Sequence, residues 1–215
     1  METMQHYIKP LPGATWSPRH FGNGCNRFVD QLVEKINSGM ESGQIYPFNS
    51  PNIILMFTQP KKDSKNGRFL LNAVDRNKAV RDTIVEMTNA RMIIDWMEKF
   101  KFRVIMDLID GYDNIRLHSD SEKYSTFSCF EGLCNTRYMQ QGDKNAPATV
   151  IRAMSYLLRK FKGKNVIVDL NDILIVADTF EELVQVIRKV CQILLDNVFY
   201  LNRKKCNSCE KDYKY

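Results

Sequence analysis

The sequence lacks the features that mark membrane, secreted and repetitive proteins. No apolar run approaches the ~20 residues that a helix needs to span a bilayer, which excludes a membrane protein. No secretory signal opens the chain and the six cysteines follow no regular spacing, so we expect reduced thiols and an intracellular protein. Internal repeats and low-complexity tracts are also absent. Cys206 and Cys209 have the spacing of half a zinc site, but no second pair follows, and we interpret them as ordinary thiols.

The composition is that of a folded protein with a mild excess of positive charge. The chain has 215 residues, of which 44% are hydrophobic and 26% charged, enough for one large domain or one domain with a small appendage. Its formal charge of +6 is compatible with nucleic-acid binding, although a solvated basic surface is an equally simple reading. Part of the excess is grouped at residues 61–68, 159–164 and 203–205.

Hydrophobic spacing predicts helices and strands that alternate along the chain. Residues 1–25 are rich in Pro and Gly and predict an extended arm that lies on a body. Helical spacing occurs at 26–38, 80–100 and 145–161, and a last helix begins at Thr179, where Glu182 completes a capping box. Strand-like pieces flank Glu131-Gly132 and the stretch 169–172. Together these elements predict an α+β fold in which an antiparallel sheet packs on helices.

Carboxylates stand at the ends of apolar runs, where an unpartnered charge would be costly. Asp107 follows "FRVIM", Asp110 comes three residues later, and Asp172 interrupts "VIVDLNDILIVAD". Carboxylates on neighbouring strand ends suit Mg²⁺, which prefers a few anionic oxygens and keeps room for substrate phosphates. A turn residue is an equally good reading of Asp110, which precedes Gly111. For Asp107 and Asp172 the residues alone leave both readings open.

Six stretches, in unbroken order from about Arg27 to Cys206, resemble the reverse transcriptases of gypsy-type LTR retrotransposons. They are "KINSGMESGQIYPFNSPN", "QPKKDSKNGRF", "VIMDLIDGYDNIRL", "MQQGDKNAPATV", "VIVDLNDILIVADTFEELVQVIRKV" and "LNRKKC". The resemblance implies a right-hand polymerase-like fingers and palm in residues 26–215. The fingers would take about 26–100 and 120–150, and the palm about 101–119 and 151–215. The chain ends about where the family's thumb would begin, so the resemblance implies that the thumb is absent.

The resemblance also implies roles for single residues. Asp107 and Asp172 would bind the catalytic Mg²⁺ or Mn²⁺. Tyr112 would lie under the incoming sugar, and Gln141, with Gly142 and Pro147, would line the nucleotide and template side. Lys61 or Lys62, together with Arg68, would hold the triphosphate, because ammonium and guanidinium groups suit phosphate oxygens. The plain alternatives are a core aromatic for Tyr112 and exposed hairpin charges for the three basic residues.

The sequence departs from the family pattern at the metal site itself. The family reads Tyr-x-Asp-Asp where this chain reads Asp169-Leu170-Asn171-Asp172, so a neutral amide stands in place of a metal-binding carboxylate. Losing that charge predicts a rate lower by roughly three orders of magnitude or more. Asp169 lies two residues before Asn171 along a strand, so its side chain is predicted to point to the same face. It lies too early in the strand to give the geometry of the carboxylate that Asn171 replaces. In the fingers, Asn72, Ala73 and Val74 also depart from the pattern.

Three functions follow from these observations. The first is a reverse-transcriptase-like domain of retrotransposon origin that no longer polymerises and that binds RNA, DNA or a protein partner. The second is a weakly active RNA-directed DNA polymerase that uses Mg²⁺ or Mn²⁺. The third is a structural module that self-associates, for example as a homodimer. The neutral Asn171 favours the first and third functions over the second, and we prefer the first to the third by a small margin.

Overall fold

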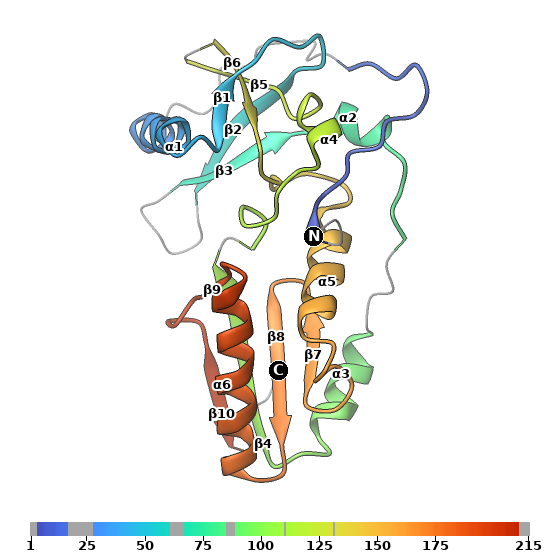
Figure 1. The fold of residues 1–215 in the computed structure, drawn as a ribbon, viewed down its shortest axis with the longest axis vertical. Coiled ribbons are helices and arrows are strands. Elements are labelled where there is room, and N and C mark those ends of the chain that lie inside the picture. The colour runs from blue at the N-terminus through green and yellow to red at the C-terminus, as the bar shows by residue number, and fades with distance from the viewer. Residues whose placement is uncertain are drawn as a thin grey trace. The chain divides into compact units, whose positions relative to one another are not determined.

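The structure, a computed structural model, describes residues 4–16, 28–60, 67–84, 89–109, 111–130 and 132–210, without the side chains of Arg68 and residues 207–210. The chain forms two compact units (Figure 1). Unit 1 comprises Met1–Thr83 and Ile115–Ala146, and unit 2 comprises Ile84–Asn114 and Pro147–Tyr215. Both units are built from two separate stretches of the chain. The boundaries that the resemblance implies for fingers and palm stay a prediction.

Unit 1 is a mixed five-stranded sheet with the strand order β1-β6-β5-β2-β3. The strands β2 and β5 run parallel, and the other neighbours are antiparallel. The predicted hairpin at Glu131-Gly132 is confirmed as β5 and β6. The elements of unit 1 are α1 (Val29–Glu41), β1 (Ile45–Pro47), β2 (Ile54–Pro60), β3 (Gly67–Asn72), α2 (Val74–Lys78), α4 (Ser119–Glu122), β5 (Phe127–Cys129) and β6 (Gly132–Thr136).

The described part of the N-terminal arm lies along unit 1. The backbone N–H of Leu11 donates to the carbonyl of Ala79, and that of Ile8 donates to Ser121 Oγ, both at short distances of 2.8 and 2.9 Å. Trp16 is 5% exposed and joins the core of this unit with Ile54, Leu71, Ala73, Phe127 and Cys134. Residues 4–16 are therefore part of the packed body of unit 1.

Unit 2 is an antiparallel sheet with the strand order β10-β4-β8-β7, and β9 pairs with the end of β4. The central strand β8 reads "DILIVA" and is buried from Ile173 to Ala177, because both faces of the sheet are covered there. The elements are α3 (Ala90–Met97), β4 (Phe102–Ile109), α5 (Ala146–Leu157), β7 (Val166–Asp169), β8 (Asp172–Ala177), α6 (Phe180–Asp196), β9 (Tyr200–Leu201) and β10 (Asn207–Glu210).

The two faces of this sheet are covered by different helices. Helix α6 packs on β8 and β4, and it buries Leu183, Val186, Val190 and Leu194. On the other face, Ile93 and Met97 of α3 pack against Leu174 and Val176 of β8, with Ile105 and Ile167 beside them. Side chains at alternate positions of each strand thus pack against different helices on opposite faces of the sheet. None of the helices within the described residues is long and apolar enough to cross a membrane.

Two local predictions need correction. Of the helix predicted over residues 80–100, the described residues form α3, which begins at Ala90 after Asn89 accepts the N–H of Arg91. Residues 80–84 are not helical, and 85–88 lie outside the description. Apolar spacing over 80–100 predicts core positions at Ile84 and Met92, but Ile84 is 96% exposed and lies before the helix. Met92 is 64% exposed, because the helix turns Ile93 and Met97 to the sheet instead. The capping box of α6 is half formed. Thr179 Oγ1 accepts from the N–H of Glu182, but the Glu182 carboxylate accepts from Asn165 Nδ2.

Candidate functional site: a row of carboxylates in unit 2

Strand pairing aligns three carboxylates across one face of the unit 2 sheet. Asp107 of β4 lies opposite Asp172 of β8, and Asp172 lies opposite Asp169 of β7. Directly opposed residues of antiparallel strands have Cβ atoms ~4.5–5.5 Å apart and point to the same face. The row that precedes them on this face is apolar and consists of Ile105, Leu174 and Ile167. The face therefore changes from an apolar row under α3 to an acidic row, which we call the carboxylate row.

The hairpin between β7 and β8 turns at Leu170 and Asn171. Leu170 has a φ of 52°, a left-handed conformation that a leucine rarely adopts and that costs ~1–2 kcal/mol. Asn171 lies outside both strands, so strand alternation does not extend to it. The prediction that Asp169 and Asn171 share a strand face is therefore wrong. Asp169 instead lines up with Asp172, since a two-residue turn sets them opposite each other.

Asn171 lies close to the end of β4 and to Gly111, which follows that strand. Its backbone carbonyl accepts the N–H of Leu108 at 3.0 Å. Its side-chain Oδ1 is buried and has no hydrogen-bond partner among the residues that the structure describes. A Cβ at Gly111 would lie 3.3 Å from this Oδ1, so a larger residue at position 111 would crowd the amide. A buried, unpartnered amide oxygen is unusual and marks a polar site that the fold itself does not satisfy.

The charges of the row act on one another. Burial raises the pKa of the Asp172 carboxyl, and the neighbouring Asp107 and Asp169 raise it further, whereas Lys205 lowers it. Lys205 Nζ lies 3.2 Å from Asp107 Oδ2, and the Asp107 side chain is 19% exposed. One ammonium group thus offsets a row of three adjacent carboxylates.

The donors match a divalent ion in kind but not in arrangement. Carboxylate and amide oxygens are the ligands that Mg²⁺ and Mn²⁺ prefer. Within the described ranges, however, no three His, Cys, Asp or Glu side chains are grouped so that they could hold a metal ion. Asp107 is engaged by Lys205, and Asp110 lies outside the described residues. As they stand, these residues do not fit a divalent ion.

The remaining predicted site residues lie in different units. Tyr112 is in the turn after β4 in unit 2, half-buried, and burial raises the pKa of its hydroxyl. In unit 1 the carbonyl of Gln141 accepts the N–H of Leu71 at 3.4 Å. Gly142 has a φ of 111°, and a Cβ there would lie 2.5 Å from the carbonyl oxygen of Leu71, so this position requires glycine.

The basic residues predicted for the triphosphate are less fully described. Arg68 lies in β3 of unit 1, where it pairs with Gln59, but its side chain is outside the description. Lys61 and Lys62 lie outside the described residues altogether. The structure therefore groups Asp107, Asn171 and Asp172 in one unit, and it leaves the roles predicted for the three basic residues as predictions.

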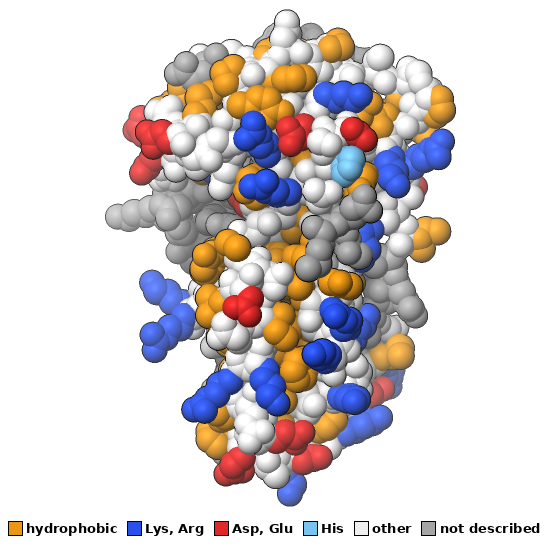
Figure 2. All heavy atoms as spheres, in the orientation of Figure 1, with side chains coloured by type: hydrophobic (Ala, Val, Ile, Leu, Met, Phe, Trp, Pro, Cys, Tyr) orange, Lys and Arg blue, Asp and Glu red, His pale blue; other side chains and the backbone are white. Residues whose placement is uncertain are grey.

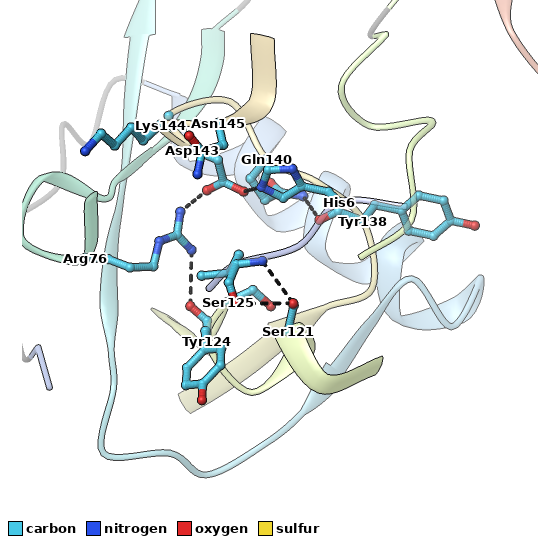
Figure 3. Close-up of polar contacts among 12 residues, drawn as sticks. His6, Arg76, Ser121, Tyr124, Ser125, Tyr138, Gln140, Asp143, Lys144 and Asn145 are labelled. Carbon is cyan, nitrogen blue, oxygen red and sulfur yellow. Dashed lines mark hydrogen bonds and ion pairs between the residues drawn. The ribbon is translucent and has the colours of Figure 1, made fainter. Parts of the chain in front are cut away.

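Sequence reasoning missed a buried ionic cluster in unit 1 (Figure 3). Arg76 of α2 is 2% exposed and pairs with the carboxylate of Asp143, whose other oxygen lies 3.5 Å from Nε2 of the buried His6. The guanidinium also donates to the carbonyl of Tyr124 at 3.1 Å. Burial lowers the pKa of Arg76 to about 9, so it remains charged at neutral pH. No local pattern marks these residues, because they come from distant parts of the chain.

The topology of the two sheets defines a fold class, the α+β polymerase-like fingers-and-palm fold. Solved structures of foamy viral protease-reverse transcriptase have this fold. The complex with dsDNA gives a TM-score of 0.83 at 19% identity and covers 99% of this chain and 44% of that chain. The complex with RNA/DNA hybrid gives a TM-score of 0.77 at 21% identity and covers 94% of this chain and 27% of that chain.

The chain belongs to the reverse transcriptase (RNA-dependent DNA polymerase) family, which it matches over residues 59–215. It is 28% identical over 190 residues to the retrovirus-related Pol polyprotein from transposon 297 of Drosophila melanogaster. It is 25% identical over 187 residues to the transposon Tf2-3 polyprotein of Schizosaccharomyces pombe. These matches cover 86% and 87% of this chain but only 18% and 14% of the polyproteins.

Proposed function

We propose that this chain is a reverse-transcriptase domain of gypsy-type retrotransposon origin that has lost polymerisation and acts by binding nucleic acid. The observation that carries the proposal is Asn171, a neutral amide with an unpartnered Oδ1 at the hairpin tip, where the family pattern has a carboxylate. Metal-assisted phosphoryl transfer needs concentrated negative charge to hold its cations. An amide and an ion-paired Asp107 supply less of that charge.

Retained nucleic-acid binding is supported by charge and by the solved relatives. The chain carries 31 Lys and Arg against 25 Asp and Glu. Figure 2 shows blue Lys and Arg side chains over this face of both units, with fewer red acidic ones. Two of the solved foamy viral enzymes are complexes with dsDNA and with RNA/DNA hybrid. Phosphate contacts need no catalytic metal, so this binding does not depend on the carboxylate that Asn171 replaces.

A weakly active polymerase is the second candidate, and one observation favours it. Asp169 is in register with Asp172 and Asp107, so the row has three carboxylates despite Asn171. A protein-binding or self-associating module is the third candidate. It is supported by apolar side chains of unit 2 that are 42 to 59% exposed, namely Ile109, Leu195, Val198 and Tyr200.

Primer extension on a homopolymer template, in Mg²⁺ and in Mn²⁺, tests the loss of activity. The unaltered chain is run beside Asn171→Asp, Asp107→Ala and Asp169→Asn. We expect no extension by the unaltered chain. Extension by Asn171→Asp would show that the missing carboxylate charge accounts for the lack of polymerase activity. If the unaltered chain extends the primer and Asp107→Ala abolishes this extension, the proposal is refuted. If Asp169→Asn also lowers the extension, Asp169 belongs to the active site.

Binding is measured separately, by fluorescence anisotropy of a labelled RNA/DNA duplex at several salt concentrations. Because each phosphate contact releases counterions, we expect affinity to fall steeply between about 50 and 200 mM salt. Affinity that is undetectable or independent of salt contradicts nucleic-acid binding and points to a protein partner or to self-association.

A further inference from the structure

Two cysteine side chains touch on the β5–β6 hairpin of unit 1. Their sulfur atoms, Sγ of Cys129 and Sγ of Cys134, are 3.2 Å apart, and both residues are thiols. Cys129 lies opposite Gly132 in the register, so Cys134, two residues further along β6, is its diagonal neighbour on the same face of the sheet. Diagonal neighbours lie ~7–8 Å apart, which means that the two side chains are turned toward each other.

The two thiols differ in their access to solvent. Cys129 is partly exposed, whereas Cys134 is 1% exposed and belongs to the hydrophobic core of unit 1. A reagent in solution therefore reaches Cys129 and not Cys134. An accessible thiol in contact with a second, protected thiol is the arrangement in which the first reacts with an oxidant and the second resolves the product.

The hairpin leaves room for a bond between the two sulfurs. A disulfide bond is ~2.05 Å long, so the sulfurs must approach each other by about 1 Å. Gly132 has no side chain, and apart from its chain neighbours no described atom lies within 4 Å of the place that a Cβ would take. The end of the hairpin can therefore shift by this amount without a clash. The present separation of 3.2 Å also lies within the ~3–3.5 Å at which atoms are placed to react with each other.

We propose that Cys129 and Cys134 form a thiol–disulfide exchange site, which a small-molecule disulfide such as oxidised glutathione converts to an intramolecular disulfide. The Cys129 thiolate attacks one sulfur of the reagent, so that a mixed disulfide forms and the first glutathione leaves as a thiolate. The Cys134 thiolate then attacks the Cys129 sulfur, which forms the protein disulfide and releases the second glutathione. The two cysteines lose two electrons to the reagent, and their two protons pass through solvent to the two glutathione thiolates.

The test uses the full chain, which is reduced, freed of reductant and incubated with excess oxidised glutathione at about pH 8, where thiols are partly ionised. The reaction is stopped with acid, and the peptides are mapped by mass spectrometry without reduction. We expect a disulfide between Cys129 and Cys134, with a mass lower by two hydrogen atoms, and its loss when dithiothreitol is added. This result needs no substitution, so it does not depend on the folding of a variant.

Two variants establish the order of the steps. Cys134→Ala removes the resolving thiol, so the glutathione adduct at Cys129 should accumulate to at least about tenfold its level in the unaltered chain. Cys129→Ala should leave Cys134 without glutathione in the folded protein, because Cys134 is buried. The matched control is Cys206→Ala, which removes another partly exposed thiol outside the hairpin and should leave the Cys129–Cys134 disulfide unchanged.

Three results would overturn the inference. The first is the absence of a Cys129–Cys134 disulfide in the unaltered chain after oxidation. The second is an equal level of glutathione adduct at Cys129 in the unaltered chain and in Cys134→Ala. The third is loss of the disulfide in Cys206→Ala, which would show that the exchange runs through other thiols. This chemistry uses none of the carboxylates of unit 2, so its outcome and that of the primer-extension test are independent.

Discussion

The buried pair of Arg76 and Asp143 is expected to be the most sensitive polar contact in unit 1. Both side chains are nearly inaccessible, at 1% and 4% exposure. Arg76→Met removes the guanidinium and leaves the Asp143 carboxylate buried, with only the imidazole of His6 nearby. Removing one partner of a buried ion pair typically costs ~3–5 kcal/mol, because the remaining charge is uncompensated. We expect a loss of that size in the free energy of unfolding at pH 7.

The two tryptophans make this measurement specific to one unit. Trp16 lies in the core of unit 1, and Trp96 lies in α3 of unit 2. In a Trp96→Phe background, fluorescence during urea unfolding therefore reports unit 1 alone. Protonation removes the uncompensated charge that Arg76→Met leaves buried at Asp143, so the loss should shrink as the pH falls.

The chain offers a control on the same helix. Lys78 and Asp75 form an exposed pair, with 73% and 58% exposure, so Lys78→Met should change the stability by less than ~1 kcal/mol. The double variant Arg76→Met/Asp143→Leu should recover part of the loss, since no charge is then left buried. A loss below ~1 kcal/mol for Arg76→Met, or an equal loss for Lys78→Met, would refute the reasoning about burial.

Two further predictions concern unit 2. Because burial and like charges raise the pKa of Asp172 on folding, its ionisation lowers stability as the pH rises through that pKa. Asp172 is itself exposed, so solvent screens these repulsions, and Asp172→Asn should raise the thermal midpoint in EDTA at pH 7 by the equivalent of only ~0.2–1 kcal/mol, with no effect near pH 3. Asp178→Asn, which removes an exposed carboxylate outside the row, should leave the midpoint unchanged at both pH values. Val198 lies two residues after the end of α6 and has a φ of 63°. Its N–H donates to the carbonyl of Leu195 and the N–H of Phe199 to that of Leu194, which is a helix end that favours glycine at position 198. Val198→Gly should stabilise the protein in urea by ~1 kcal/mol and Val198→Ala by less, and a destabilising Val198→Gly would contradict this account.

The elements that sequence reasoning predicted well are those with a local signal. The run "VIVDLNDILIVAD" has two apolar halves and a polar tip, and it is the β7–β8 hairpin. The hairpin predicted around Glu131-Gly132 is likewise β5 and β6, and β6 begins at Gly132 opposite Cys129. Helix α3 was predicted too long because Ile84 fits the spacing of an apolar face, and spacing alone does not reveal where the chain leaves the helix.

What could not be predicted depends on pairing between distant segments. The alignment of Asp169 with Asp172 follows from a turn of two residues, and a turn of another length would have separated them. Lys205 reaches Asp107 because the chain returns to β4 nearly a hundred residues later. The pairing of Arg76 with Asp143 joins residues 67 positions apart, and His6 lies far from both in sequence. Such contacts have no periodicity for a sequence pattern to record.

The interleaving of the two units governs the order in which a ribosome can complete them. Residues of unit 1 resume at Ile115 after a stretch that belongs to unit 2, and β4 must wait for β8, whose first residue is Asp172, before it gains a partner. During synthesis β4 therefore emerges as an apolar strand without a partner strand. Because a ribosome adds ~5–20 residues per second, this interval lasts some seconds. Pairing over such separations makes folding slow and exposes strand edges to aggregation. Cutting the gene between Asn114 and Ile115 would separate β4 from its partner β8. A chaperone that shields β4 would act during the interval before β8 is made.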